Sequence, residues 1–389
     1  MTTTVPKHRQ IYAAVRRDIQ SGRLADGARL PSEAELVQTY GASRITVGRA
    51  MRDLQTAGLV ERRAGSGTFV RGARPAAGLT FGLLIPDLGD TEIFEPICQG
   101  MMASPLAQAH ALVWGSPGGG VESKAERAWL LCRQYIDRRV AGVFFAPLEG
   151  IPDQDAANAR VLLALDAARV PVVLLDRPAL PYPDRGTHDL VGIDNRRAGF
   201  LVTAHLLALG SQRLAFVARP HAAATVDARE AGYREALFAG GLDADRRRIA
   251  RLDPLDQAAV QAWMAVARPD AIVCANDRTA AHLMPALLRL GYTIPGDVRM
   301  AGIDDVEYAS LLPVPLTTLR QPTHQIGDAA LSVMLERVAR RELPPRDVLL
   351  HCELVVRESC GGKKDCAISA PNPEPGTARI SRAAAPPPD

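Results

Sequence analysis

The stretch from Leu30 to Val70 constrains the fold most, because helix-capping residues and glycines recur in it at short intervals. Before it, apolar residues recur at helical spacing over residues 9–22 and predict a first helix. Pro31 blocks continuation of a helix. Ser32 and Glu35 then form an S-x-x-E capping box, so a second helix is expected to begin here.

A third helix and a hairpin follow. Gly41 supplies a tight turn, and the Ser43 hydroxyl can accept a hydrogen bond from a free amide in the first turn of the next helix. The inward face of that helix is expected to consist of Val47, Ala50, Met51 and Leu54. The run from Leu59 to Val70 has glycines at its centre and predicts a hairpin. Short helices followed by a hairpin form a winged helix-turn-helix, a shape that enters a DNA groove.

The solvent face of the third helix carries residues suited to DNA. Arg44 and Arg49 suit guanine edges or phosphate oxygens, and the Thr46 hydroxyl suits a phosphate or base contact. In the hairpin, Gly65 and Gly67 let the backbone approach a duplex closely. Residues 1–72 carry a net charge of +6 and the remainder carries −3. The alternative for the arginines is a solvated helix face, but this imbalance favours a polyanionic partner for the small domain.

Residues 7–71 resemble the winged-helix domain of GntR-type regulators, whose pattern is L-P-S-E-x-x-L, then S-R-x-T-V, then G-x-G-T-F-V. The positions that the resemblance places against DNA are Ser43, Arg44, Thr46, Ala64, Gly65, Ser66 and Gly67. The sequence departs from the family at Gly48, where arginine is usual, and at Ala34, where arginine or lysine is frequent. Either Arg49 replaces the missing contact or Gly48 allows closer approach, so the base sequence that is read stays open.

After residue 78, apolar runs alternate with helical patterns. The runs predicted as strands are Leu79–Ile85, Ala111–Trp114, Ala141–Phe145, Val170–Asp176, Leu190–Asp194, Leu214–Ala218, Ala271–Asn276 and Met300–Asp304. This rhythm predicts an α/β fold with parallel sheets wound by right-handed crossovers. Ligands bind beyond the carboxyl ends of such strands. The polar residues at these ends are Asp87, Asp176, Asn276 and Asp304.

A second resemblance, to the effector-binding domain of LacI/GalR-type repressors and to periplasmic sugar-binding proteins, covers about residues 79–357. The motifs that carry it, in chain order, are Phe81–Pro86, Val170–Arg177, Ile193–Asn195, Arg229–Tyr233, Cys274–Asp277 and Gly302–Asp305 with Leu316–Gln321. The resemblance implies two α/β lobes joined by three crossover strands, with a small sugar between them. The lobes would comprise residues 79–191 with 321–350, and residues 192–320 with 351–357.

The ligand positions of that family map onto Asp176, Arg229, Asn276, Asp304 and Gln321. Their chemistry suits a polyol, because carboxylates accept hydroxyl protons while arginine and asparagine donate. Asp87 is added from its strand end, and Phe94 as a ring that could stack on a sugar. The alternatives are that Asp176 and Asp304 cap helices or turns, that Arg229 forms a surface ion pair, and that Phe94 belongs to the core.

No catalytic constellation and no cofactor motif emerges. The six cysteines form no C-x-x-C pair, and the spacing of Cys352, Cys360 and Cys366 near His351 is too irregular to predict a metal site. Gly118–Gly120 lacks the Lys-Ser/Thr of a phosphate-binding loop and is interpreted as an ordinary loop. Cys98 and Cys274 are expected to be packed free thiols of a reducing cytoplasm.

The expected organisation is a winged-helix domain over residues 1–72, a linker over 73–78, the effector domain over 79–357 and a disordered tail over 358–389. No secretory signal and no apolar run long enough to span a membrane is present, so a cytoplasmic location is expected.

These features predict a sugar-responsive transcription regulator, most simply a repressor. A homodimer would place two recognition helices on a palindromic stretch of double-stranded operator DNA. The same pair of modules resembles arabinose-type repressors. Two alternatives are a sugar-binding receptor without gene control and an enzyme fused to a DNA-binding head.

Overall fold

The structure is a computed structural model that describes residues 7–20, 23–24, 27–56, 59–63, 66–70, 78–85, 88, 92–115 and 123–362. The chain divides into two compact units, and the boundary between them falls at Thr80, with the short segment Gln108–Ala111 grouped with the first unit. Each unit is described separately below.

The first unit is a winged helix-turn-helix, as the sequence predicts. Its elements are α1 (Lys7–Gln20), α2 (Glu33–Tyr40), α3 (Arg44–Thr56), β1 (Val60–Arg63) and β2 (Gly67–Val70). The Ser32–Glu35 capping box is present, and Gly41 ends α2 in the left-handed conformation. The four residues predicted for the inward face of α3 are all buried in one core with α1 and α2.

The wing is an antiparallel pair of strands whose turn demands glycine. β1 pairs with β2 from Val60 opposite Val70 to Arg63 opposite Gly67. Gly67 has a φ of +115°, which side chains other than glycine rarely adopt. A Cβ atom at Gly67 would also lie 2.9 Å from Nε of Arg29, which packs against the wing. Gly67 is therefore required by both its backbone conformation and the close approach of Arg29.

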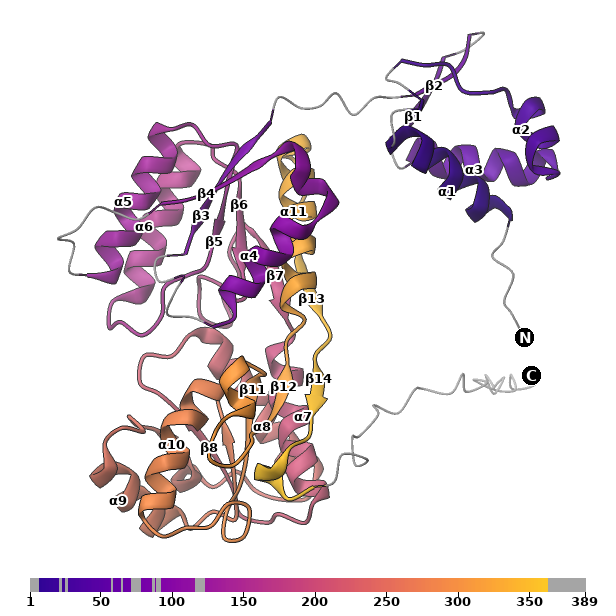
Figure 1. The fold of residues 1–389 in the computed structure, drawn as a ribbon. Coiled ribbons are helices and arrows are strands. Elements are labelled where there is room, and N and C mark those ends of the chain that lie inside the picture. The colour runs from indigo at the N-terminus through magenta and orange to yellow at the C-terminus, as the bar shows by residue number, and fades with distance from the viewer. Residues whose placement is uncertain are drawn as a thin grey trace, which may run out of the picture. The chain divides into compact units, whose positions relative to one another are not determined.

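The second unit contains two lobes, each built on a six-stranded sheet with helices on both faces (Figure 1). In the first lobe the strand order is β13-β7-β6-β5-β3-β4, and the pairs from β13 to β3 are parallel. Its strands are β3 (Thr80–Leu84), β4 (Ala111–Trp114), β5 (Gly142–Phe145), β6 (Val172–Leu175), β7 (Asp189–Ile193) and β13 (Asp347–Leu350). Its helices are α4 (Phe94–Ala103), α5 (Lys124–Asp137), α6 (Gln154–Ala167) and α11 (Thr323–Ala339), with η1 (Pro105–Ala109).

The second lobe repeats the arrangement with the order β14-β12-β11-β10-β8-β9, parallel except where β14 joins β12. Its strands are β8 (Leu214–Ala218), β9 (Ile249–Arg251), β10 (Ala271–Cys274), β11 (Arg299–Asp304), β12 (Thr317–Arg320) and β14 (Glu353–Val355). Its helices are α7 (Asn195–Ala208), α8 (Ala224–Ala239), α9 (Gln257–Ala267) and α10 (Asp277–Arg289), with η2 (Arg246–Arg248), η3 (Glu307–Ser310) and η4 (Glu358–Cys360). The predicted α/β class with parallel sheets is confirmed.

The chain crosses between the lobes three times, from β7 to α7, from β12 to α11 and from β13 to β14. The first lobe, expected to run to about residue 191, ends with β7, which pairs with β6 as far as Val191 and with β13 as far as Ile193. Figure 1 shows the crossing segments passing together from one lobe to the other.

The prediction that a disordered tail begins at residue 358 is wrong. Ser359 and Cys360 are fully buried in η4. The Ser359 hydroxyl donates to the carbonyl oxygen of Met300 (2.7 Å) and accepts from the amide of Thr317 (2.8 Å). These bonds join η4 to β11 and β12, so residues 358–360 belong to the second lobe. The remainder of the expected tail, 363–389, lies outside the described residues.

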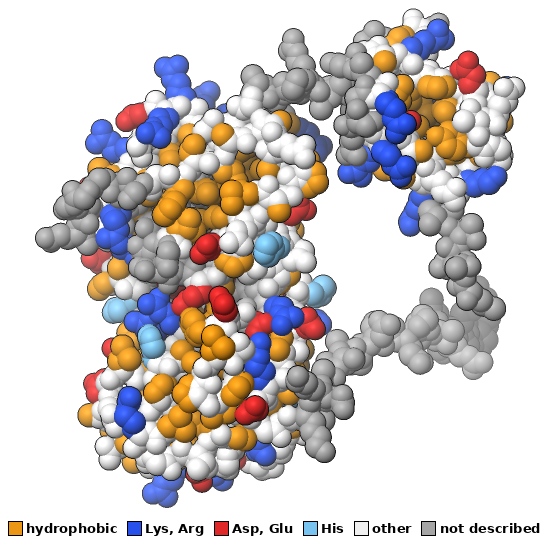
Figure 2. Space-filling view, viewed as in Figure 1, with side chains coloured by type: hydrophobic (Ala, Val, Ile, Leu, Met, Phe, Trp, Pro, Cys, Tyr) orange, Lys and Arg blue, Asp and Glu red, His pale blue; other side chains and the backbone are white. Residues whose placement is uncertain are grey.

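The two lobes touch through polar groups near the carboxyl ends of their strands. The amide of Gly150 donates to the carbonyl oxygen of His221 (2.8 Å), and the Tyr308 hydroxyl lies 3.1 Å from Oε1 of Glu92. Figure 2 shows basic, acidic and histidine side chains gathered at the level where the lobes meet, between surfaces richer in apolar side chains. The boundary between the lobes is therefore the polar part of this unit.

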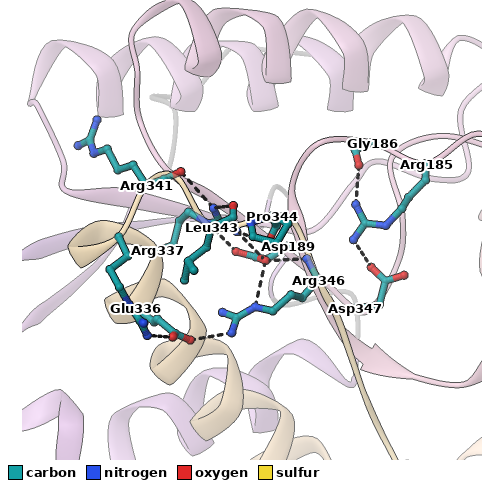
Figure 3. A network of polar contacts seen from close by, with 11 residues as sticks. Arg185, Gly186, Asp189, Glu336, Arg337, Arg341, Leu343, Pro344, Arg346 and Asp347 are labelled. Carbon is teal, nitrogen blue, oxygen red and sulfur yellow. Dashed lines mark hydrogen bonds and ion pairs between the residues drawn. The ribbon is translucent and has the colours of Figure 1, made fainter. Parts of the chain in front are cut away.

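A buried ion network fastens the outer strand of the first lobe (Figure 3). Asp189, at the start of β7, is fully buried and accepts two hydrogen bonds from Arg337 of α11, at 2.8 and 3.0 Å. The amide of Arg346, just before β13, donates to the same carboxylate at 2.9 Å. The Arg346 guanidinium in turn pairs with Glu336. One carboxylate thus joins β7, α11 and the segment that leads into the third crossing.

Candidate functional sites

The exposed face of α3 and the wing together form a groove of about 360 Å³ in the first unit. Arg44 and Arg52 of α3 and Arg62 of β1 line it. Arg62 also lies 3.8 Å from Glu33, an exposed pair at the start of α2. Cations from a helix and from a wing strand therefore border the same groove, which suits a phosphate backbone.

The other predicted DNA-facing residues that the structure describes belong to the start of α3, to α3 itself and to the wing. Ser43 caps α3 by accepting from the amide of Thr46 (3.3 Å), and the two hydroxyls lie 2.9 Å apart. Arg49 and Ser66 are exposed. Ile45, between two predicted contact residues, is 82 % exposed and lines the groove. Ala64 and Gly65 lie outside the described residues.

In the second unit, three of the predicted ligand residues form one hydrogen-bonded cluster. Oδ1 of Asp304, at the end of β11, accepts from Nε2 of Gln321 (2.8 Å) and lies 3.4 Å from a guanidinium nitrogen of Arg229. Arg229 and Gln321 are buried. We call Asp176, Arg229, Asp304 and Gln321 the inner cluster, since Asp176 is close enough to influence the pKa of Asp304.

Close helix packing positions Arg229. A Cβ atom at Gly232 of α8 would overlap the carbonyl oxygen of Arg196, and one at Gly199 of α7 would overlap that of Arg229. The two helices can therefore approach only because both positions are glycine. At this contact the Arg229 guanidinium donates to Oδ1 of Asn195 (2.8 Å) and to the carbonyl oxygen of Ala275 (2.7 Å). These bonds fix its direction toward Asp304.

Burial and neighbouring charges shift the pKa values of Asp304 and of the nearby Asp277. Burial raises the pKa of Asp304 to about 6, although Arg229 and Gln321 act to lower it. Burial and the charge of Asp304 raise the pKa of the neighbouring Asp277 to about 7. Asp277 accepts from the Thr318 hydroxyl (2.6 Å) and the Val306 amide (3.2 Å). These bonds connect α10 to β12 and to the segment that follows β11.

Asp176 lies on the first-lobe side of the cluster, in a left-handed backbone conformation with a φ of 67°. Its Oδ2 accepts from Nε of Arg177 (3.1 Å), and Arg177 also pairs with Glu149. Burial disfavours the Arg177 charge, but Glu149 and Asp176 hold the pKa of the guanidinium above its ordinary value. Phe94 is 2 % exposed, and the guanidinium lies 5.2 Å from its ring centroid. The ring therefore packs in the core beneath Arg177.

Asn276 caps α10, because its Oδ1 accepts from the amide (2.9 Å) and the hydroxyl (2.7 Å) of Thr279. It also lines a cavity of about 460 Å³ between the lobes. Ala275, whose carbonyl accepts from Arg229, lines the same cavity, so the cavity borders the inner cluster. Asp87, the remaining predicted ligand residue, lies outside the described residues.

Two buried oxygen atoms of the inner cluster accept no hydrogen bond from any described residue. They are Oδ1 of Asp176 and Oε1 of Gln321. Buried acceptors are almost always paired in folded proteins, so an unpaired one calls for a donor from outside the chain. Hydroxyl groups of a polyol are such donors, and the Arg229 guanidinium can donate to their oxygens in return.

Sequence reasoning missed several residues at this site. Asn195 and Asp277 fall inside quoted motifs but were assigned no role. Glu149 lies in a loop that is distant in the sequence from its ion-pair partner Arg177. Cys352 lies on the third crossing, near enough to the inner cluster that Arg229 and Asp304 influence its pKa, which burial raises to about 12. Only the folded arrangement brings these together.

Other chemistry is limited in the described part of the chain. No group of three or more His, Cys, Asp or Glu side chains is arranged there to hold a metal ion. Cys98 and Cys274 are buried free thiols, as predicted. None of the described helices is long and apolar enough to cross a membrane.

Two family models match the chain. The model of the gntR family of bacterial regulatory proteins matches residues 7–70, and that of the periplasmic binding protein-like domain matches residues 203–360. The first covers the winged helix. The second covers most of the second lobe together with the second and third crossings.

Similar proteins are transcriptional regulators. The arabinose metabolism transcriptional repressor of Geobacillus stearothermophilus is 26 % identical over 373 residues, which is 92 % of this chain and 98 % of that protein. The HTH-type transcriptional regulator MalR of Streptomyces coelicolor is 27 % identical over 342 residues, covering 84 % and 95 % of the two chains.

Solved structures share the fold. The transcriptional regulator CelR in complex with cellobiose matches with a TM-score of 0.61 at 23 % identity, covering 85 % of this chain and all of that one. A LacI-family regulator from Enterococcus faecium with bound ribose matches with a TM-score of 0.58 at 22 % identity over 72 % of this chain and 98 % of that one.

Fold, sites and comparisons define a transcription regulator that joins DNA binding and effector sensing in one chain. In particular, the chain combines a GntR-type helix-turn-helix domain with a periplasmic-binding-protein-like domain, and its homologues are arabinose-type and LacI-family transcriptional repressors. The resemblances drawn from the sequence are confirmed.

Proposed function

We propose that this chain represses transcription by binding double-stranded operator DNA through α3 and the wing, and that a small sugar-like effector at the inner cluster controls that binding. The observation that carries the effector assignment is the pair of buried, unpaired oxygens on Asp176 and Gln321, beside the directed Arg229 guanidinium. Relatives that bear the same fold are described with ribose or cellobiose bound.

The predicted site residues keep their proposed roles. Ser43, Arg44, Thr46, Arg49 and the wing residues Ala64–Gly67 are proposed to contact DNA. Asp176, Asp304 and Gln321 accept hydrogen bonds from effector hydroxyls, and Arg229 donates to effector oxygens. Asn276 and Asp87 border the bound effector. Phe94 acts through Arg177, which it supports, rather than by stacking on the ligand.

Effector control follows from the placement of the site at the lobe boundary. A ligand held by Asp176 from the first lobe and Asp304 from the second stabilises one arrangement of the lobes over another. A tenfold preference for the arrangement that binds DNA poorly corresponds to about 1.4 kcal/mol. We propose a cytoplasmic homodimer, because two winged helices then meet two half-sites of a palindrome.

The proposal has two alternatives. A sugar-binding receptor without gene control leaves the arginine-lined groove of the first unit without a role. An enzyme with a DNA-binding head requires a nucleophile paired with a general base, whereas the carboxylates of the inner cluster are paired with Arg177, Arg229 and Gln321. Neither explains both units.

A thermal-shift screen of the purified full chain tests the effector assignment. The panel consists of pentoses, hexoses, disaccharides, sugar phosphates and nucleosides. A ligand that binds only the folded state raises stability by RT ln(1 + [L]/Kd), so an effector at 100 Kd adds about 2.7 kcal/mol. A shift that disappears in Asp304→Asn supports the proposal, and no shift with any compound contradicts it.

A further inference from the structure

Three cationic side chains surround the cavity that borders the inner cluster. Lys124, at the start of α5, comes from the first lobe. Arg219 follows β8, and Arg278 lies in the first turn of α10, both in the second lobe. We call these residues the outer cations. All three are half-buried, which confines their charged ends to the cavity and its rim.

The described lining of the same cavity contains fewer carboxylates than cations. Only Glu149 and Asp253 contribute carboxylates to its lining. Glu149 is already paired with Arg177, which lowers its pKa against the effect of burial. Asp253 uses Oδ1 to accept from the amide of Leu255 (3.1 Å). Arg219, which lines the cavity, forms no hydrogen bond or ion pair with another described residue.

The electrostatic effect of the outer cations extends into α10. His282, one turn after Arg278, has a pKa below its ordinary value, first because of burial and then because of the charges of Arg219 and Arg278. The two guanidinium groups therefore act on the same region. Figure 2 shows basic and histidine side chains together at the level where the lobes meet.

Contacts on both lobes connect the lining of this cavity to the inner cluster. Ala275 and Asn276 line the cavity, and the Ala275 carbonyl accepts from Arg229 of the inner cluster. On the opposite lobe, Glu149 lines the cavity and joins Arg177, which bonds Asp176. A ligand whose hydroxyls reach the inner cluster would therefore extend its other end among the outer cations.

We infer that the effector is a sugar phosphate, with its hydroxyls at the inner cluster and its phosphate monoester between Lys124, Arg219 and Arg278. This inference rests on the proposed sugar-responsive function and narrows it. A phosphate monoester carries close to two negative charges at neutral pH and three strong acceptor oxygens, which matches three separate cations better than the two oxygens of a carboxylate do. The cavity volume of about 460 Å³ leaves room for such a group.

The phosphate also supplies a means of holding the lobes together. Lys124 belongs to the first lobe, while Arg219 and Arg278 belong to the second, so one phosphate bridges both. Lys124 already donates to the carbonyl oxygen of Glu149 (3.0 Å), which keeps its ammonium group at this boundary. A neutral sugar lacks this bridge, so it would stabilise the closed arrangement less.

Isothermal titration of the full chain tests the inference with matched pairs of probes. The pairs are D-ribose with D-ribose 5-phosphate, L-arabinose with L-arabinose 5-phosphate, and D-glucose with D-glucose 6-phosphate, and D-glucuronate serves as the carboxylate probe. The variant is Arg219→Gln. Its matched control is Arg289→Gln, which removes an exposed arginine at the end of α10, away from the cavity.

At least one phosphate is expected to bind about tenfold or more tightly than its parent sugar, since hydrogen bonds to charged groups are the stronger kind. Arg219→Gln should reduce this preference by about tenfold and leave the affinity for the parent sugar unchanged, and Arg289→Gln should change neither. A neutral sugar that binds as tightly as its phosphate and releases DNA overturns this inference and leaves the proposed function intact. Preference for glucuronate over every phosphate overturns the phosphate assignment. Silence with all probes overturns both.

Discussion

Gln321 donates its side-chain amide to Oδ1 of Asp304 over 2.8 Å, and this bond joins the carboxylate at the end of β11 to a segment that connects the lobes. Asp304 ends β11 in the second lobe, whereas Gln321 lies between β12 and α11, on the second crossing. A ligand that accepts or donates at Asp304 therefore acts directly on the crossing segment. This contact gives the effector site a physical connection to the relative arrangement of the lobes.

Asp304→Asn should separate sensing from DNA binding. The substitution removes the charge that accepts from Arg229 and from the effector, and a hydrogen bond to a charged group is worth about 1.5–3 kcal/mol. Effector affinity should fall by about 10- to 100-fold while operator affinity without effector stays unchanged, as measured by titration calorimetry and fluorescence anisotropy. Asp243→Asn, at an exposed carboxylate of the same lobe, should alter neither quantity.

Arg44→Ala should have the reverse effect. Loss of a contact from α3 to a base or phosphate should weaken operator binding by about 1–3 kcal/mol and lessen its salt dependence. The thermal shift produced by the effector should remain. Arg16→Ala removes an exposed arginine of α1 and serves as the control. If both variants weakened operator binding equally, general positive charge rather than the groove beside α3 would account for the affinity.

The buried ion network of the first lobe should contribute more to the free energy of unfolding than the exposed pair of Arg185 and Asp347, which is drawn beside it in Figure 3. Asp189→Ala leaves the Arg337 guanidinium without its carboxylate and should cost about 3–5 kcal/mol in the free energy of unfolding. Asp347→Ala breaks only the half-exposed pair with Arg185 (2.7 Å) and should cost less than about 1 kcal/mol. Urea unfolding of the full chain compares them, and equal losses would contradict the assignment of a structural role to Asp189.

Asp277 should make stability depend on pH. Its pKa of about 7 in the folded state lies above the ordinary value of 3.8, because burial and Asp304 disfavour its charge. The folded state thus holds the proton more tightly, and this contribution to stability is lost as the pH rises toward 7 and above. Asn mimics the protonated form and can still accept from the Val306 amide and donate to Thr318.

The measurement is the melting temperature of the wild type and of Asp277→Asn between pH 5 and pH 8. The variant should gain on the wild type by at least about 2 °C across this range, since other titrating groups contribute to both proteins. A difference that stays constant with pH would show that Asp277 does not titrate in this range, which contradicts a pKa of about 7.

The winged helix could be predicted almost completely from the sequence, because its signals are local. The capping box at Ser32 and Glu35, the left-handed Gly41 and the inward face of α3 each depend on neighbours within a few residues. The strands of the second unit were equally accessible, since buried parallel strands form short apolar runs. The strands that were missed are β9, β12, β13 and β14. Each has only three or four residues and includes a charged one, so none gives such a run.

The effector site could be predicted only in part. The family motifs identified the residues of the inner cluster, and the structure brings Arg229, Asp304 and Gln321 into hydrogen-bonding distance. The outer cations could not be predicted from the sequence, because they come from three separate elements in two lobes and no local pattern relates them. The expected start of the tail was wrong for a similar reason: Ser359 owes its burial to bonds with β11 and β12, not to its neighbours in sequence.

The measurement that tests the account most directly is the affinity of the full chain for operator DNA with and without effector. A DNA fragment selected from a randomised library by the purified protein is labelled and titrated by fluorescence anisotropy in the presence of each sugar and sugar phosphate. The account predicts that at least one of these compounds weakens binding about tenfold or more, and that Asp304→Asn abolishes the response. DNA binding that no sugar or sugar phosphate alters, or an effect that persists in Asp304→Asn, would contradict it.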